Sequence, residues 1–257
     1  MEFDAEASRL IEAAYATPDI AATRGAVFRA LNLRSGDNVA DIGCGPGYLL
    51  ADLAPAVGET GRALGVDVSE AMVATARQRC SAWRNVEVSV GDVTALDIAD
   101  GTLDAVSMMQ VMAYVPDLDA ALGELRRVLR PGGRLVVLDT DYDGLVWQSR
   151  DRERMRRVRN AYDAHAPWPD VVRLLPEKLA RSGFELERLE LAPIVTTNYH
   201  PNTFVHGFAR FLARFVVQSG GMDGAQVQAW LDEFDELEHD RAFLFSLPRF
   251  VFSARRS

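Results

Sequence analysis

Three glycines in one short loop are the first residues of this chain that could do chemistry. Gly43, Gly45 and Gly47 lie in the run Val39-Ala-Asp-Ile-Gly-Cys-Gly-Pro-Gly47, after an apolar strand-like stretch and before a helix-like one. Glycine backbones adopt positive φ and leave room for a ligand, and a helix N-terminus offers free N–H groups and a positive dipole end. The loop predicts a cradle for a nucleotide-like ligand, although a glycine loop alone is a weak signal.

Two residues next to the loop indicate which kind of ligand it binds. A dinucleotide-binding G-x-G-x-x-G loop would place Gly or Ala at position 48, but this chain has Tyr48 there. Asp41 lies two residues upstream of the loop. A carboxylate at this place suits a ligand with a cationic amine and sulfonium better than a pyrophosphate, so the pattern disfavours a nicotinamide dinucleotide.

Two further carboxylates follow the next two predicted strands. Asp67 ends Gly65-Val66-Asp67, where it can accept two ribose hydroxyls, and Asp92 lies in Gly91-Asp92-Val93, near an adenine edge. Each of the three aspartates could instead be a cap or turn residue. Their position at three successive strand ends, the edge where open α/β sheets bind ligands, favours a binding site.

Alternating strands and helices must position these residues. Strands are predicted at 38–42, 62–67, 86–90, 103–109, 133–140, 184–192 and 242–253. Helices are predicted at 5–15, 19–31, 47–54, 69–82, 117–130, 151–164 and 170–182, with a mostly helical section at 202–240. Ser69 is the expected N-cap of 69–82, and Pro131-Gly132-Gly133 is expected to end 117–130. We expect an α/β fold, doubly wound around a mostly parallel seven-stranded sheet with an antiparallel last strand and helical cap insertions.

Residues 36–140 resemble the class I (Rossmann-like) methyltransferases that depend on S-adenosylmethionine (SAM), in the small-molecule branch similar to quinone-pathway, type 11 enzymes. The glycine loop, the three aspartates and Leu129-Arg130-Pro131-Gly132-Gly133 carry the resemblance. It implies SAM as the cofactor, with the methionine part held by Asp41, Gly43, Gly45 and Gly47, the ribose by Asp67, the adenine by Val68, Met72, Asp92 and Val93, and Gln110 near the methyl donor. It also implies one domain over 1–257, with a helical lid at 1–31, the SAM-binding core at 36–140 and a C-terminal half at 141–257 that carries a helical cap at 202–240.

The residues that would act on the methyl acceptor are less marked. Methyl transfer needs mainly approach geometry and water exclusion, with a general base only if the acceptor carries a proton. Similar methyltransferases often have His-Val-Pro-Asp after the fourth strand, where this chain has Tyr114-Val115-Pro116-Asp117. The catalytic candidates are Tyr114, Asp139 and Asp141, and the two aspartates could equally solvate a loop or cap a helix.

Several other residues have two open interpretations. Phe204, Phe208, Phe211 and Phe215 recur at helical spacing and form either a core face or the lining of an acceptor pocket. Tyr15 is a lid residue or a core aromatic, and His165, His200 and His206 are bases or ordinary polar residues.

Composition excludes several classes of function. The net charge of −9 argues against a nucleic-acid partner, and Arg150–Arg159, with six arginines and two acids, is a solvated helix face or a rim for an anionic acceptor. Cys44 and Cys80 form no metal-ligand pair, so no metal site is predicted. No stretch reaches membrane-spanning length and the first residues are unlike a signal peptide, so we expect a cytoplasmic protein with a small-molecule acceptor and no membrane partner. Its oligomeric state is not predicted.

Two alternatives stay within the same fold. One is a SAM-binding protein that catalyses a cyclisation or decarboxylation without methyl transfer. The other is an RNA or protein methyltransferase, which the acidity and the absence of an Asn-Pro-Pro-Tyr type motif disfavour, since the chain reads Met109-Gln110-Val111-Met112 there.

Overall fold

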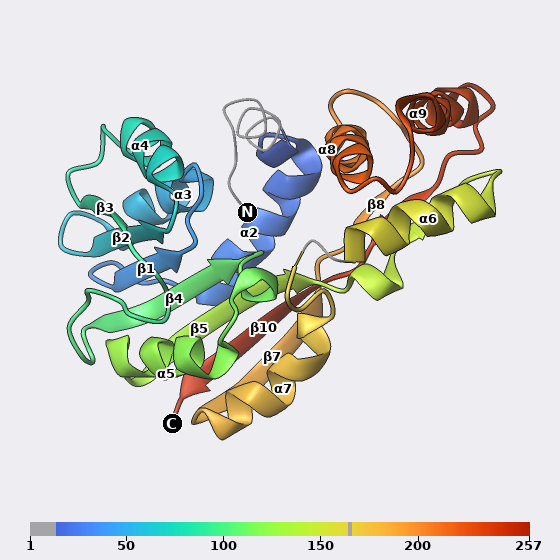
Figure 1. Cartoon of the computed structure of the whole chain (residues 1–257). Coiled ribbons are helices and arrows are strands. Elements are labelled where there is room, and N and C mark those ends of the chain that lie inside the picture. Colours follow the sequence, from blue (N-terminus) through green and yellow to red (C-terminus); the bar gives the residue numbers. More distant parts are fainter. Residues whose placement is uncertain (1–13, 164–165) are drawn as a thin grey trace. The chain divides into compact units, whose positions relative to one another are not determined.

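The computed structural model describes residues 14–163 and 166–257, which divide into two compact units (Figure 1). We call Arg24–Asp141, Asp170–Ala192 and Arg249–Ser257 the sheet unit. The insert unit consists of the described residues of Met1–Thr23, Tyr142–Pro169 and Pro193–Pro248. The single domain over 1–257, the lid at 1–31 and the cap at 202–240 stay predictions.

The sheet unit is built on one seven-stranded sheet, in the order β3-β2-β1-β4-β5-β10-β7. Its strands are β1 (Asn38–Ile42), β2 (Arg62–Asp67), β3 (Val86–Val90), β4 (Leu103–Met109), β5 (Leu129–Thr140), β7 (Phe184–Leu191) and β10 (Arg249–Arg256). The strands from β1 to β5 pair in parallel, and β10 is antiparallel to both β5 and β7. The predicted α/β fold with an antiparallel last strand is confirmed.

Helices flank this sheet and connect its strands. They are α3 (Tyr48–Val57), α4 (Glu70–Arg79), α5 (Leu118–Val128) and α7 (Val171–Arg181), while α2 (Pro18–Leu31) begins in the insert unit and ends in the sheet unit. Ser69 caps α4 as predicted, because its side chain accepts a hydrogen bond from the Met72 amide. Asp117 caps α5 in the same way through the Ala120 amide. Among the helices that the described residues form, none is long and apolar enough to cross a membrane.

The described residues of the insert unit include a small sheet and three complete α-helices. Strands β6 (Val146–Trp147), β9 (Phe245–Leu247) and β8 (Ile194–Thr196) pair antiparallel in that order, and the helices are α6 (Arg152–Asp163), α8 (Phe204–Gln218) and α9 (Gly224–His239). The ring of Trp147 stacks on Phe208 and Phe234, with centroids 5.8 and 5.0 Å away. Aromatic side chains therefore form the core of this unit.

Two predicted strand boundaries were wrong. The strand predicted at 242–253 is two strands in different sheets, β9 and β10, because Pro248 between them lacks the N–H that a continuous strand would need. Strand β5 starts at Leu129 rather than 133, so Pro131-Gly132-Gly133 lies within the strand and α5 already ends at Val128. The short strands β6 and β8 were not predicted, since two or three residues show no period-2 pattern.

Candidate functional site

The strand order of the sheet unit reverses between β1 and β4, which lie side by side. Open α/β sheets bind ligands at such a reversal, outside the carboxyl ends of the strands. Gly43 follows β1 with φ of 72°, and a Cβ added there would lie 2.3 Å from Cγ2 of Val111, in the segment after β4. The loops after these two strands thus pack so closely that position 43 needs glycine.

The other two glycines of the loop differ in what surrounds them. Gly47 has φ of 80°, and a Cβ there would lie 2.9 Å from the Cβ of Ala76 in α4. Gly45 has φ of 51°, and a Cβ there would meet no atom within 4 Å. Helix α3 begins at Tyr48, directly after the loop. Gly47 is therefore explained by packing, whereas Gly45 leaves backbone open beside a helix N-terminus, as a ligand cradle requires.

Asp67, at the end of β2, is tied to this loop. Its Oδ2 accepts a hydrogen bond from the Gly45 amide at 2.8 Å, and its Oδ1 accepts one from the Ser69 amide at 2.9 Å. The next residue, Val68, is 69% exposed, and Met72 in the first turns of α4 is buried. The structure thus brings a carboxylate to the edge of the glycine loop, with an exposed apolar side chain beside it.

Asp41 is a buried carboxyl beneath the loop, with only 2% of its surface exposed. The Ser107 hydroxyl donates a hydrogen bond to its Oδ1 at 2.8 Å. Burial raises the pKa of Asp41 to about 7, the Ser107 bond opposes this rise, and the nearby charge of Asp67 adds to it. A cation bound next to Asp41 would favour its ionised form.

Asp92 lies in a turn after β3, while the next residue, Val93, is buried. Oδ1 of Asp92 accepts hydrogen bonds from both the amide and the hydroxyl of Thr94, each at 2.8 Å. The carboxylate is exposed, and this turn matches the simpler of the two interpretations of Asp92. A turn of this kind leaves the other carboxylate oxygen available for a further contact.

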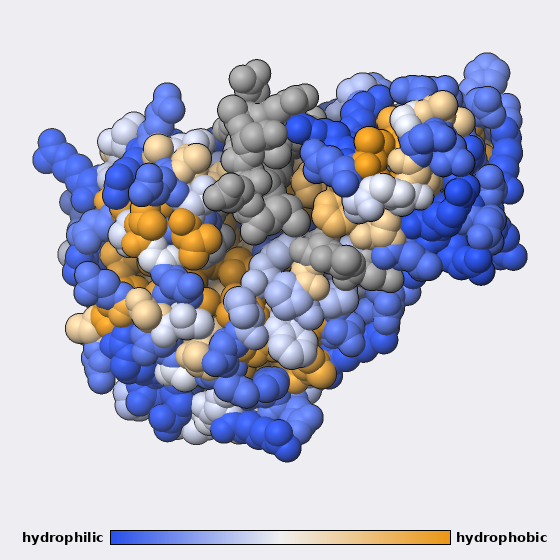
Figure 2. Space-filling model, viewed as in Figure 1, coloured by the Kyte–Doolittle hydropathy of each residue, from blue (hydrophilic) through white to orange (hydrophobic). Residues whose placement is uncertain are grey.

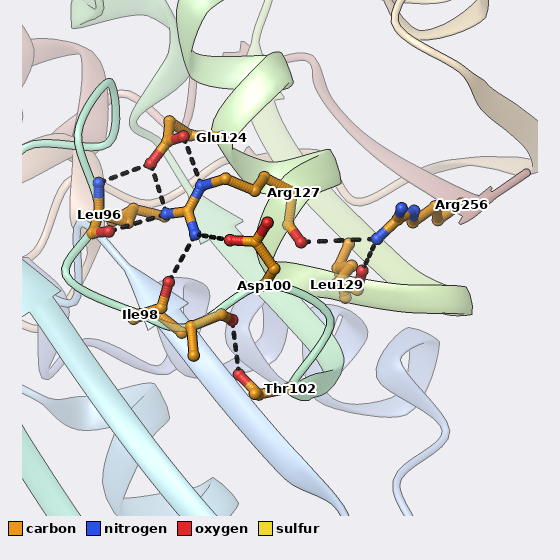
Figure 3. Close-up of polar contacts among 9 residues, drawn as sticks. Leu96, Ile98, Asp100, Thr102, Glu124, Arg127, Leu129 and Arg256 are labelled. Carbon is orange, nitrogen blue, oxygen red and sulfur yellow. Dashed lines mark hydrogen bonds and ion pairs between the residues drawn. The ribbon is translucent and has the colours of Figure 1, made fainter.

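The segment that follows Asp92 is held in place by Arg127 of α5 (Figure 3). The guanidinium group donates to the carbonyl oxygens of Leu96 and Ile98 at 2.8 and 2.7 Å and to Asp100 at 2.6 Å. It also forms two bonds to the carboxylate of Glu124, at 2.7 and 2.8 Å, and that carboxylate accepts the Leu96 amide. Arg127 therefore anchors to α5 the loop that carries Asp92.

Gln110 directly follows β4 and has a strained backbone conformation, with φ of 61°. Its amide nitrogen donates to Oδ1 of Asp139 at 3.0 Å, while its amide oxygen accepts the Thr140 hydroxyl at 2.5 Å and a guanidinium nitrogen of Arg249 at 2.9 Å. Asp139 is fully buried and also accepts the Ala113 amide at 3.3 Å. Burial raises its pKa to about 6, although the backbone bonds from Thr140 and Ala113 and the charge of Arg249 oppose the rise.

Comparison with known proteins shows which proteins this chain resembles. Residues 39–133 match the family model described as a methyltransferase domain. The chain is 37% identical to demethylmenaquinone methyltransferase of Staphylococcus saprophyticus over 117 residues, which are 46% of this chain and 50% of that enzyme. Residues 39–133 are therefore similar to a methyltransferase domain.

The likeness to other proteins extends beyond this domain. An uncharacterized 37.1 kDa protein in transposon TN4556 of Streptomyces fradiae is 37% identical over 224 residues, which are 84% of this chain and 63% of that protein. The chain therefore spans between about half and two thirds of the length of these relatives. The crystal structure of geranyl diphosphate C-methyltransferase from Streptomyces coelicolor has a similar fold, with a TM-score of 0.57 and 18% identity over 92% of this chain and 76% of that chain.

The three predicted catalytic residues have different surroundings in the structure. Tyr114 lies in the short helix η1 (Met112–Tyr114) and is 38% exposed. The carboxylate of Asp141 forms an ion pair with Arg173 of α7 at 3.0 Å. Asp139 has no exposed surface and contacts Gln110 instead. Of the three, Tyr114 has the exposed side chain that a direct contact with an acceptor requires, and all three roles stay predictions.

The remaining candidates lie in the insert unit. Phe208 is buried between aromatic rings, stacked on Phe204 and Trp147, so the core interpretation holds for it. His200 is exposed and accepts a hydrogen bond from the Asn202 amide. His206 lies beside Tyr199, and its partial burial lowers its pKa. Tyr15 is half-buried, and His165 lies outside the described residues.

Sequence reasoning missed three residues that shape the site: Ser107, Arg127 and Arg249. Each acts on a residue far away in the sequence, and no local motif marks it. The structure carries no candidate metal centre in its described portion, since no three His, Cys, Asp or Glu side chains there are grouped to hold an ion.

Proposed function

We propose that this chain transfers a methyl group from SAM to O, N or C of a small apolar or aromatic molecule. One observation carries the proposal. At the strand-order reversal of a methyltransferase domain, the carboxylate of Asp67 is hydrogen-bonded to the amide of Gly45, whose Cα faces open space.

The residues present fit SAM. The carboxylate of Asp67 would accept the ribose hydroxyls, and the open backbone at Gly45 leaves room for the methionine part. Asp41 would face positive charge, because the ionised form of a buried carboxyl needs a cation nearby. Val68 offers apolar surface for the adenine ring. Asp92 and the Val93 amide would contact the polar edge of that ring. When bound, SAM would supply a methyl group already activated by its sulfonium.

The chain's own part in the reaction is positioning and water exclusion. The side chain of Gln110 is hydrogen-bonded to Asp139, Thr140 and Arg249, and these bonds would hold it next to the methyl donor. Tyr114, four residues further along the chain and exposed, would contact the acceptor. Asp139 would act through Gln110 rather than on the acceptor, because it is fully buried.

Two observations support a small molecule as the acceptor. The net charge of −9 disfavours a nucleic acid. Two of the similar proteins are named for demethylmenaquinone and geranyl diphosphate.

The test is a turnover assay of the whole chain with SAM and a panel of quinols, phenols and isoprenoids. Methyl transfer forms one S-adenosylhomocysteine for each methylated product, and both are measured by mass spectrometry. A product that forms while SAM is unchanged would instead support the cyclisation or decarboxylation alternative. Binding of NAD or NADP without binding of SAM, measured by calorimetry, would refute the proposed cofactor.

A further inference from the structure

A pocket of about 370 Å³ lies wholly within the insert unit. It is lined by β6 and the two residues after it and by one face of α6. Its lining includes Val146, Trp147, Arg152, Met155, Arg156 and Arg159. The methyltransferase domain contributes no residue to this pocket, and the proposed reaction gives it no role.

Three arginines give the pocket its charge. Arg152, Arg156 and Arg159 are four and three residues apart in α6, and this spacing places them on one face of the helix. At the rise of about 1.5 Å per residue, they extend over about 10 Å of that face. The surface over α6 is hydrophilic in Figure 2.

These guanidinium groups are only weakly neutralised. Arg152 forms no hydrogen bond or ion pair with any other described residue. Arg156 pairs with Glu153 at 2.7 Å, but both side chains are largely exposed, and such surface pairs break easily. Arg159 uses one nitrogen on the carbonyl oxygen of Asp143 at 3.2 Å. Among the described residues, no aspartate or glutamate lines the pocket.

Two other arginines of this segment, which do not line the pocket, form ion pairs with acidic residues of α9. Arg150 forms an ion pair with Glu236 of α9 at 2.9 Å, and Arg154 pairs with the buried carboxylate of Glu233 on the same helix. The acids of α9 thus hold these two arginines. The arginines of the pocket have no such buried acidic partner among the described residues, in a chain whose net charge is −9.

Apolar surface adjoins this charge. Val146 is a largely exposed valine, and Trp147 and Met155 also line the pocket from buried positions. Guanidinium groups bind phosphate oxygens through paired N–H donors, and several arginines suit a group with more than one negative charge better than a single carboxylate. We propose that this pocket binds the phosphate or diphosphate group of a small molecule whose apolar part lies against Val146 and Trp147.

The test is titration calorimetry of the whole chain with inorganic diphosphate and with pentyl diphosphate, at physiological ionic strength. Arg152→Gln should weaken the binding of both ligands at least about tenfold, because a charge-assisted hydrogen bond is lost. Arg157→Gln is the matched control. Arg157 is exposed on the same helix outside the pocket, so its replacement removes the same charge and should change affinity less than about twofold. Val146→Ser should weaken pentyl diphosphate alone.

Several results would overturn the proposal. One is the absence of diphosphate binding to the wild-type chain. Another is an equal loss in the Arg152 and Arg157 variants, which would indicate a diffuse charge effect. No loss in Arg152→Gln would place the anion elsewhere, for example at the glycine loop. Tighter, Arg152-dependent binding of single-stranded DNA or of anionic lipid vesicles would assign the surface to a macromolecule or a membrane. Because SAM is absent from these measurements, their outcome is independent of the proposed methyl transfer.

Discussion

Oδ2 of Asp67 accepts a hydrogen bond from the backbone N–H of Gly45 at 2.8 Å, and this bond joins the end of β2 to the loop after β1. The carboxylate that would bind the ribose therefore also sets the position of the loop that would receive the methionine part. Changes at either residue are expected to act on both functions.

Replacement of Asp67 tests this double role. Asp67→Ala should weaken SAM at least about tenfold in calorimetry, because charge-assisted hydrogen bonds are worth about 1.5–3 kcal/mol each. Asp97→Ala serves as the control, since Asp97 is an exposed aspartate of the same unit and its loss should leave SAM affinity unchanged. A folded Asp67→Ala protein with wild-type affinity would show that the ribose binds elsewhere.

Gly45→Ala tests whether a Cβ at position 45 blocks SAM binding in addition to straining the backbone. A residue with a Cβ at positive φ costs about 1–2 kcal/mol, and Gly220 in the insert unit has the same combination of positive φ and open surroundings. Both Gly45→Ala and Gly220→Ala should lower the free energy of unfolding by a similar amount in urea denaturation. Only Gly45→Ala should abolish SAM binding. Equal SAM affinity in the two variants would contradict the cradle.

The pKa of Asp41 predicts how SAM binding depends on pH. Asp41 is mostly protonated below about pH 7, and a cationic ligand favours its ionised form, so affinity should rise by about fivefold or more between pH 5.5 and 7.5. In Asp41→Asn this rise should disappear, while any titration of SAM itself remains in both proteins. Calorimetry at both pH values measures the difference, and parallel curves would show that no cation binds beside Asp41.

Asp139 should make stability depend on pH in a defined direction. Its pKa in the folded protein, about 6, lies above the usual 3.8, so the folded state keeps its proton to higher pH than the unfolded state. The contribution of Asp139 to the free energy of unfolding therefore becomes less favourable as the pH rises from about 4 to 6, and it is constant above about pH 6. The unfolding free energy of Asp139→Asn, relative to wild type, should increase from pH 4.5 to 7.5 by about 1 kcal/mol or more. A constant difference would mean that Asp139 ionises normally.

Arg127 should stabilise the loop that carries Asp92. Arg127→Met leaves the carbonyl groups of Leu96 and Ile98 without their charged donor, and the expected loss of stability is about 2 kcal/mol. Amide hydrogen exchange over 92–102 should become faster, and SAM should bind several times more weakly. Arg126→Met changes the adjacent, exposed arginine. It should change neither the amide exchange over 92–102 nor the affinity for SAM. If both variants behave alike, the bonds in Figure 3 do not hold the loop.

Much of the sheet unit could be predicted because its signals are local. The strands at 38–42, 62–67, 86–90 and 103–109 are apolar runs bounded by turn residues, and the structure has them at these bounds. The positions of Gly43 and Asp67 follow from them, since the carboxyl ends of parallel strands meet at one edge. The closeness of Gly43 to Val111 and the bond from Asp67 to Gly45 could not be predicted, because they depend on side-chain placement.

The site residues that could not be predicted from the sequence act through contacts between distant positions. Arg249 reaches Gln110 across 139 positions of sequence, and Ser107 reaches Asp41 across 66. Neither residue type is unusual at its place. The break at Pro248 was missed for another reason, since β9 and β10 form one apolar run whose two halves belong to different sheets.

The position of β10 between β5 and β7 has a consequence for how the chain folds during synthesis. β10 comes after β5, β7 and the whole insert unit in sequence, so β5 and β7 each have an unpaired edge until the ribosome has made residues 249–256. Unpaired strand edges invite pairing with other chains, and contacts between distant residues slow folding. A nascent chain stalled within α9 would therefore expose two aggregation-prone edges that the finished sheet unit covers with a single strand.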